Sequence, residues 1–172
     1  FSHSIQSIEK FIRKKQLFSF MKYKPKICFI SEYHKIKRSK LLYLYGYINL
    51  KWSVDEIFLN SKISNKIDNN QAIFTSNKER NLDLLINIWK NYIFPQNNKF
   101  KLLVNSENDN ERNFQIYKRN IGHQKELIDD LKSSRLYLIP GHKAELFCLA
   151  AEEARELCIP IVTLGIGCLK ER

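Results

Sequence analysis

The sequence predicts an α/β fold in which a parallel sheet carries helices on both faces. Short, continuous apolar runs are typical of strands that are buried on both sides. Segments with apolar residues at helical spacing separate these runs, and such alternation is typical of βαβ units. The predicted elements are a strand at 72–75, a helix at 81–92, strands at 100–104 and 115–121, a helix at 124–131, a strand at 136–139, a helix at 145–157 and a strand at 159–164.

The helix over 81–92 shows the clearest periodicity. Its apolar face consists of Leu82, Leu85, Ile86, Trp89 and Ile93. The successive steps between them are 3, 1, 3 and 4 residues, which keeps them on one side of a helix. A polar loop over 105–113 follows the second strand. In the helix over 124–131, Leu127, Ile128 and Leu131 share one side.

The first third of the chain has a different character. Residues 1–26 are basic and patchily amphipathic, and Pro25 ends any helix there. A buried strand is expected at 27–31, and Ser31 could cap a helix that runs to Tyr45, before Gly46. The stretch 60–70 is polar and rich in Asn, so we interpret it as a linker between a basic segment, 1–59, and the regular part, 71–172.

The positive charge is concentrated in that first third. The 172 residues include 29 Lys+Arg and 18 Asp+Glu, a formal net charge of +11. Residues 1–51 hold twelve basic and two acidic side chains, so the remainder is close to neutral. A basic surface for nucleic acid or for an anionic membrane would explain this distribution. AT-biased coding, which enriches Lys, Asn and Ile, explains it equally well.

Composition also restricts the other classes. The apolar runs are far shorter than the roughly 20 residues of a membrane-spanning helix. The four cysteines, Cys28, Cys148, Cys158 and Cys168, form no C-x-x-C pair. We therefore expect reduced thiols, with Cys148 and Cys158 buried in helical sequence, and a cytoplasmic protein without a metal site.

Three predicted strand-to-helix junctions carry polar groups. Thr75 to Arg80 brings Ser76 and Arg80 to the start of a helix, a combination that suits a phosphate, although an ordinary N-cap would look similar. At the second junction Gly122 permits a close backbone approach and precedes His123, although a plain turn also fits. The third junction runs from Pro140 into the helix predicted over 145–157.

That third segment contains two spaced carboxylates, Glu145 and Glu153. Seven residues separate them, so on one helix they would lie two turns apart. Glu153 is in register with Ala150 and Leu157 on the face predicted to be buried. A buried carboxylate without a partner is costly, so Glu153 is expected to meet one.

These residues resemble the E-x7-E signature of group 1 glycosyltransferases (family 4, GT-B fold). The block runs from Glu145 to Ala154 and continues into Ile159–Thr163. Three other segments resemble motifs of the same family and follow one another in the same order along the chain. They are 74–77 with 80–82, 121–123 with Glu126 and Leu127, and 165–167. The resemblance covers about 71–172. Arg80-Asn81 replaces the usual Lys-Gly, Cys158 replaces a common glycine, and Asn60-Ser61 stands where Asn-Gly is common.

The resemblance implies that 71–172 is a Rossmann-like nucleotide-sugar-binding domain, truncated at its C-terminus. It implies that 1–59 is the remnant of an N-terminal domain. The whole enzyme would transfer a sugar, with retention, from a nucleotide-diphosphate donor to a glycan or lipid-linked acceptor in polysaccharide biosynthesis. No cofactor is expected, and because there is no D-x-D motif, no metal is implied. The fragment is expected to bind nucleotide without turnover.

The resemblance also implies residue roles. Arg80 would bind the diphosphate, supported by Ser76 and by the backbone N–H groups of Leu146, Phe147, Cys148 and Leu149. Glu153 would accept the ribose hydroxyls, Glu145 would contact the donor sugar, and Gly122 and His123 would flank the base.

Two alternatives remain at the level of function. One is a non-catalytic nucleotide-binding domain. The other is a basic module formed by residues 1–51, for which an anionic membrane surface at the inner face of a membrane is favoured over nucleic acid.

Overall fold

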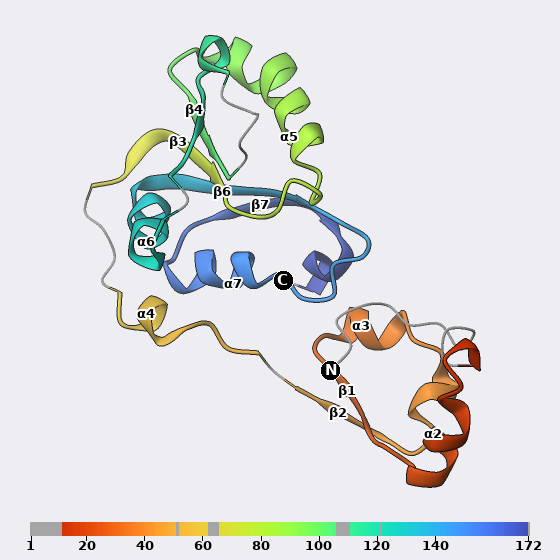
Figure 1. Cartoon of the computed structure of the whole chain (residues 1–172). Helices are drawn as coiled ribbons and strands as arrows, with labels where there is room; N and C mark the ends of the chain where they lie inside the picture. Colours follow the sequence, from red (N-terminus) through yellow and green to blue (C-terminus); the bar gives the residue numbers. More distant parts are fainter. Residues whose placement is uncertain (1–11, 51, 62–65, 106–110, 121, 172) are drawn as a thin grey trace. The chain divides into compact units, whose positions relative to one another are not determined.

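The computed structural model describes residues 12–50, 52–61, 66–105, 111–120 and 122–171 (Figure 1). The chain forms two compact units. The basic unit comprises Phe1–Ser53, Lys143–Phe147 and Gly167–Arg172, and the sheet unit comprises Val54–His142 and Cys148–Ile166.

The sheet unit contains a five-stranded sheet in which every pairing is parallel. Its strands are β3 (Asp68–Phe74), β4 (Lys101–Val104), β5 (Ile116–Lys118), β6 (Ser134–Gly141) and β7 (Ile161–Ile166), in the order β5-β4-β3-β6-β7. The helices are α4 (Glu56–Leu59), α5 (Leu82–Ile88), α6 (Gln124–Ser133) and α7 (Leu149–Glu156). Figure 1 shows α6 and α7 on one side of the sheet and α5 on the other. The predicted fold class is confirmed.

Apolar strand residues explain why both faces of the sheet are covered. Ile73, Phe74, Leu102 and Val104 are each 0% exposed. Adjacent strand residues point to opposite faces, so Ile73 and Phe74 together require packing on both sides. The predicted helix over 81–92 is α5 followed by a π-helical turn, Trp89–Ile93.

The basic unit is built from short elements. These are α2 (Leu17–Tyr23), the parallel strands β1 (Ile27–Phe29) and β2 (Tyr47–Asn49), and α3 (Glu32–Ile36). Ser31 caps α3 as predicted, because its Oγ accepts a hydrogen bond from the His34 N–H at 3.0 Å. The predicted continuation to Tyr45 is wrong. Ser39 adopts an extended conformation, so α3 ends and a separate 3₁₀ helix follows at Lys40–Tyr43.

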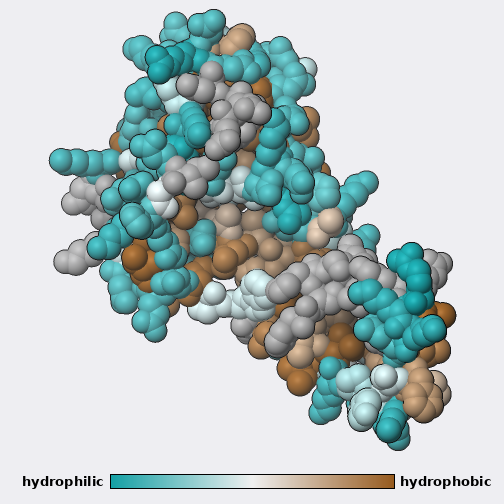
Figure 2. All heavy atoms as spheres, in the orientation of Figure 1, coloured by the Kyte–Doolittle hydropathy of each residue, from teal (hydrophilic) through white to brown (hydrophobic). Residues whose placement is uncertain are grey.

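Several exposed apolar side chains gather on the basic unit (Figure 2). Together with buried and half-buried neighbours they line a groove of about 220 Å³. The residues that form it are Leu17, Phe20, Met21, Leu41, Leu42, Leu44 and Tyr45. Over the parts of the chain that the structure describes, no helix is long and apolar enough to cross a bilayer. The anionic membrane surface stays a prediction.

The compact units do not follow the predicted domain limits along the chain. The chain passes from the basic unit to the sheet unit between Ser53 and Val54. Strand β3 begins at Asp68, so the end of the stretch interpreted as a linker is part of the sheet. The functional division into 1–59, 60–70 and 71–172 stays a prediction.

Candidate functional site

The carboxyl edge of the five-stranded sheet collects the polar junctions. From β3 the chain adds β4 and β5 on one side and then β6 and β7 on the other. Ligands of such sheets bind outside the carboxyl ends of the strands, where the strand order reverses. Here that point lies beside the ends of β3 and β6, and the predicted junctions follow β3, β5 and β6.

The junction after β3 is a compact turn. The Asn77 side chain accepts a hydrogen bond from the Glu79 N–H at 3.0 Å, and the Asn77 carbonyl accepts one from the Arg80 N–H at 2.9 Å. Ser76 and Arg80 are half-buried. Asn81 then has a left-handed backbone, with a φ of 65°, and its side-chain amide donates to the Gly141 carbonyl at the end of β6. The turn is therefore fixed to the place where the strand order reverses.

The junction after β5 carries the two residues predicted to flank a base. Gly122 and His123 are both exposed, and His123 occupies the N-cap position of α6. A Cβ added at Gly122 would overlap the Glu126 carboxylate. The absence of a Cβ at Gly122 therefore allows the Glu126 side chain to pack against this position.

The junction after β6 differs from the prediction. Helix α7 begins at Leu149 with Cys148 at its N-cap, so Glu145, Leu146 and Phe147 precede the helix and belong to the basic unit. The expected placement of Glu145 and Glu153 on one helix is wrong.

Hydrogen bonds within the basic unit explain the late start of α7. The Lys143 carbonyl accepts from the Tyr33 hydroxyl at 2.7 Å, and the Leu146 carbonyl accepts from Ser31 Oγ at 2.5 Å. The Glu145 carbonyl accepts from the Cys168 N–H at 3.2 Å. Carbonyls used in this way do not start a helix. The Glu145 side chain lies in this segment and the residue is 5% exposed.

Glu153 lies one turn into α7 and is half-buried. Burial raises the pKa of its carboxyl above the ordinary range. The fully buried positions of the helix are Ala151 and Ala154, so Glu153 lies at the border of the buried face rather than at its centre. Its carboxylate has no hydrogen-bond or ion-pair partner among the described residues, which leaves it able to accept hydroxyl groups from a ligand.

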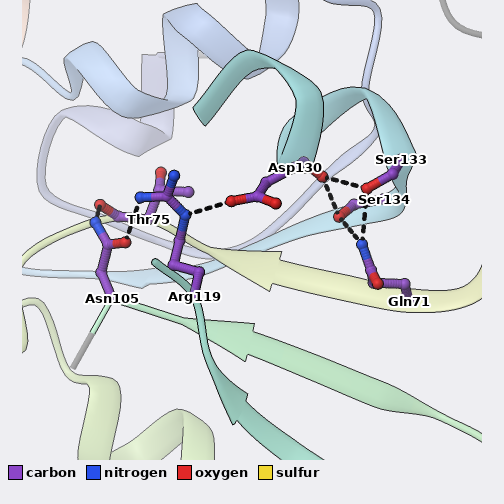
Figure 3. Close-up of polar contacts among 7 residues, drawn as sticks. All are labelled: Gln71, Thr75, Asn105, Arg119, Asp130, Ser133 and Ser134. Carbon is purple, nitrogen blue, oxygen red and sulfur yellow. Dashed lines mark hydrogen bonds and ion pairs between the residues drawn. The ribbon is translucent and has the colours of Figure 1, made fainter. Parts of the chain in front are cut away.

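The sequence analysis did not single out the polar cluster around Arg119. Arg119 follows β5 and its side chain is only 4% exposed. Its Nε donates to Asp130 Oδ2 of α6 at 2.9 Å and its Nη1 donates to Asn105 Oδ1 at 2.8 Å (Figure 3). Asn105 Nδ2 in turn donates to the Thr75 carbonyl at 2.6 Å. One feature of the sequence could have indicated this cluster. Arg119 is a charged residue inside the strand predicted over 115–121.

Two further expectations concern cysteines and metals. All four cysteines are free; Cys148 is buried as predicted, but Cys158 is exposed, so that part of the prediction is wrong. Cys158 lies beyond the end of α7, where the chain turns toward β7. Within the described ranges, no group of three or more His, Cys, Asp or Glu side chains could hold a metal ion.

Comparison with solved structures gives a match to the crystal structure of TarM, a glycosyltransferase of the GT-B type. The TM-score is 0.61 over 80% of this chain, at 13% sequence identity. The fold is similar to that of a GT-B glycosyltransferase. The chain spans 29% of the length of TarM, and an identity this low shows the fold alone. No family model matches the sequence, and no curated protein matches it.

Proposed function

We propose that the sheet unit binds the nucleotide part of a nucleotide-diphosphate sugar and serves a retaining glycosyltransferase. The observation that supports this most directly is the half-buried Glu153 carboxylate, which is desolvated and has no partner among the described side chains. Two vicinal ribose hydroxyls are donors that would satisfy both of its oxygens. The similarity to a GT-B glycosyltransferase fold agrees with such a ligand.

Other predicted site residues have complementary roles in this proposal. Arg80 binds the diphosphate, with support from Ser76 and from the N–H groups at the start of α7. The guanidinium stabilises the charge that grows on the leaving diphosphate during transfer. Gly122 and His123 flank the base. A contact of Glu145 with the donor sugar stays a prediction from the sequence. The acceptor is a glycan or a lipid-linked glycan.

Calorimetry with UDP and with GDP tests the nucleotide site. We expect one of them to bind, and we expect Arg80→Ala and Glu153→Ala to weaken binding at least about tenfold, because each removes charge-assisted hydrogen bonds. Arg135→Ala and Glu156→Ala change exposed residues of β6 and α7 and serve as matched controls that bind like the wild type.

The pH dependence of nucleotide binding tests the contribution of the Glu153 carboxylate separately. The ionised carboxylate is the better acceptor for hydroxyl groups, so nucleotide affinity should rise with pH as Glu153 loses its proton. This rise should occur above pH 4.5, the ordinary pKa of a glutamate, because burial raises the pKa. Glu153→Gln should reduce that rise. Binding of neither nucleotide at millimolar concentration, or unchanged affinity in both alanine variants, would contradict the assignment.

A further inference from the structure

The Arg119 side chain is the start of a directed chain of hydrogen bonds along the carboxyl edge of the sheet. The Arg119 backbone N–H donates to the Val104 carbonyl at 3.0 Å, which continues the pairing of β4 and β5 by one residue. The side chain then reaches Asn105, the residue directly after β4, and Asn105 reaches Thr75, the residue directly after β3. Figure 3 shows these three residues with Asp130.

The direction of each bond follows from the chemistry of the groups. A guanidinium can only donate, so the Asn105 side chain must turn its oxygen toward Arg119. The NH₂ group of the same amide then faces the Thr75 carbonyl, which can only accept. Arg119 therefore determines which way the Asn105 amide points, and Asn105 holds the Thr75 carbonyl.

Holding that carbonyl also orients the next N–H group. The peptide bonds of the described residues are all trans, and in a planar trans peptide the C=O and the N–H point in opposite directions. With its carbonyl directed at Asn105, the Thr75–Ser76 peptide directs the Ser76 N–H away from Asn105. Ser76 begins the turn that ends at Arg80. This turn is the segment that binds the diphosphate in the proposed function.

The Arg119 side chain is itself firmly held. Asp130 accepts from Nε, and the Asp130 backbone carbonyl accepts from the Ser133 and Ser134 hydroxyls at 2.9 and 2.8 Å, which anchors the end of α6. Gln71 of β3 donates to both of these hydroxyls at 3.0 Å (Figure 3). Nη2 of Arg119 is buried and makes no hydrogen bond in the described part of the chain. A buried ion pair is weak evidence of a role in stability, because well-packed apolar residues in its place often make a protein equally stable or more stable.

We propose that Arg119 is a positioning residue for the phosphate-binding turn and acts through Asn105. This inference rests on the proposed function, because the turn is assigned to the diphosphate there. Arg119 orients the side-chain amide of Asn105, and Asn105 orients the Thr75–Ser76 peptide. That peptide then presents the Ser76 N–H to the anion. Arg119 itself does not contact the nucleotide.

Paired affinities for a nucleoside diphosphate and its monophosphate test this role. With UDP and UMP, or with GDP and GMP if the guanine nucleotide binds, the ratio of the two dissociation constants isolates the contribution of the second phosphate. We expect Arg119→Met and Asn105→Leu each to reduce the diphosphate affinity about tenfold and the monophosphate affinity much less. The double variant should lose no more than the larger single loss, because both changes break the same chain.

Two further variants separate positioning from folding. Asn105→Asp keeps an acceptor for Arg119 but cannot donate to the Thr75 carbonyl. At raised salt, which screens the added charge, it should keep the melting temperature and still lose diphosphate affinity. Arg135→Met, at an exposed position of β6, should change neither affinity.

The outcomes distinguish this inference from the proposed function. If the wild-type chain binds no nucleoside diphosphate, both are overturned. If it binds one and the Arg119 and Asn105 variants leave the ratio of diphosphate to monophosphate affinity unchanged, Arg119 is not a positioning residue. The same conclusion follows if the double variant loses diphosphate affinity by the product of the two single losses. In both of these cases the proposed nucleotide site is not contradicted.

Discussion

Asn81 and Cys158 both have left-handed backbone conformations, with φ of 65° and 57°. They are two of the three positions, Ser61 being the third, at which the sequence lacks a glycine that is common in the family it resembles, the group 1 glycosyltransferases. Asparagine is one of the few other residues that adopt this conformation readily, and here its side chain also donates to the Gly141 carbonyl. Asn81 therefore replaces the glycine and adds a contact of its own.

Cys158 replaces a glycine without a comparable contact. The Cys158 N–H donates to the Arg155 carbonyl at 2.9 Å, and the Ile159 N–H donates to the Ala154 carbonyl at 3.0 Å. This pair of bonds is the Schellman motif at the end of α7, in which the residue at the position of Cys158 is usually glycine. The backbone of Cys158 is therefore strained, because the residue carries a Cβ in a left-handed conformation.

Cys158→Gly is expected to raise the free energy of unfolding by about 1 kcal/mol, because a non-glycine residue in the left-handed region costs roughly 1–2 kcal/mol and glycine gives part of this back as chain entropy. Denaturant titration followed by circular dichroism measures the change. Cys158→Ala removes the exposed thiol but keeps the Cβ, so it should bring no gain. Equal stability of the two variants would show that the strain is absent.

At the scale of elements, periodicity predicted every strand of the five-stranded sheet and the three longer helices of the sheet unit. It failed where distant residues decide the local structure. Glu145 to Leu149 continues the apolar pattern of α7, so the sequence alone favours a helix there. The carbonyls of Lys143 and Leu146 instead bond to Tyr33 and Ser31, which are 110 and 115 residues away in the sequence.

The same limit applies to the candidate site. Ser76, Arg80, Gly122 and His123 could be placed at strand-to-helix junctions because junctions follow from the order of elements. The roles of Asn105 and Arg119 could not, because they depend on which strand ends are neighbours. The order β5-β4-β3 puts their side chains next to one another, and neither residue has a local motif.

Helix α3 contains a buried histidine whose ionisation should be visible in stability. His34 is 3% exposed, its ring packs edge-on against Phe29, and its Nε2 accepts a hydrogen bond from Arg38 Nε at 3.1 Å. Burial, and then the charge of Arg38, lower the pKa of His34 from 6.5 to about 4. The folded basic unit therefore holds this imidazole neutral.

The sign of the pH effect follows from these two values. Below pH 6.5 the unfolded chain binds a proton at His34, while the folded chain does not do so until about pH 4. The free energy of unfolding should therefore fall as the pH decreases from 6.5 to 4, by roughly 3 kcal/mol at most. Denaturation midpoints of the wild type and of His34→Gln over this range measure the effect. A slope that is the same in both would show that His34 does not contribute.

At the scale of the whole molecule, charge and chemistry lie in different units. The excess of lysine and arginine belongs to residues 1–51, which fall within the basic unit. The residues proposed to bind the nucleotide lie mainly in the near-neutral sheet unit, so net charge is a poor guide to the ligand. Glu145, Leu146 and Phe147, whose contacts with the donor are predicted from the resemblance alone, belong to the basic unit.

The structure of the chain in complex with UDP or GDP is the most direct test of the nucleotide site. The proposal predicts that the Glu153 carboxylate lies within hydrogen-bond distance of the ribose hydroxyls and that the Arg80 guanidinium contacts the diphosphate. A nucleotide bound elsewhere, or one whose ribose hydroxyls face away from Glu153, would contradict it.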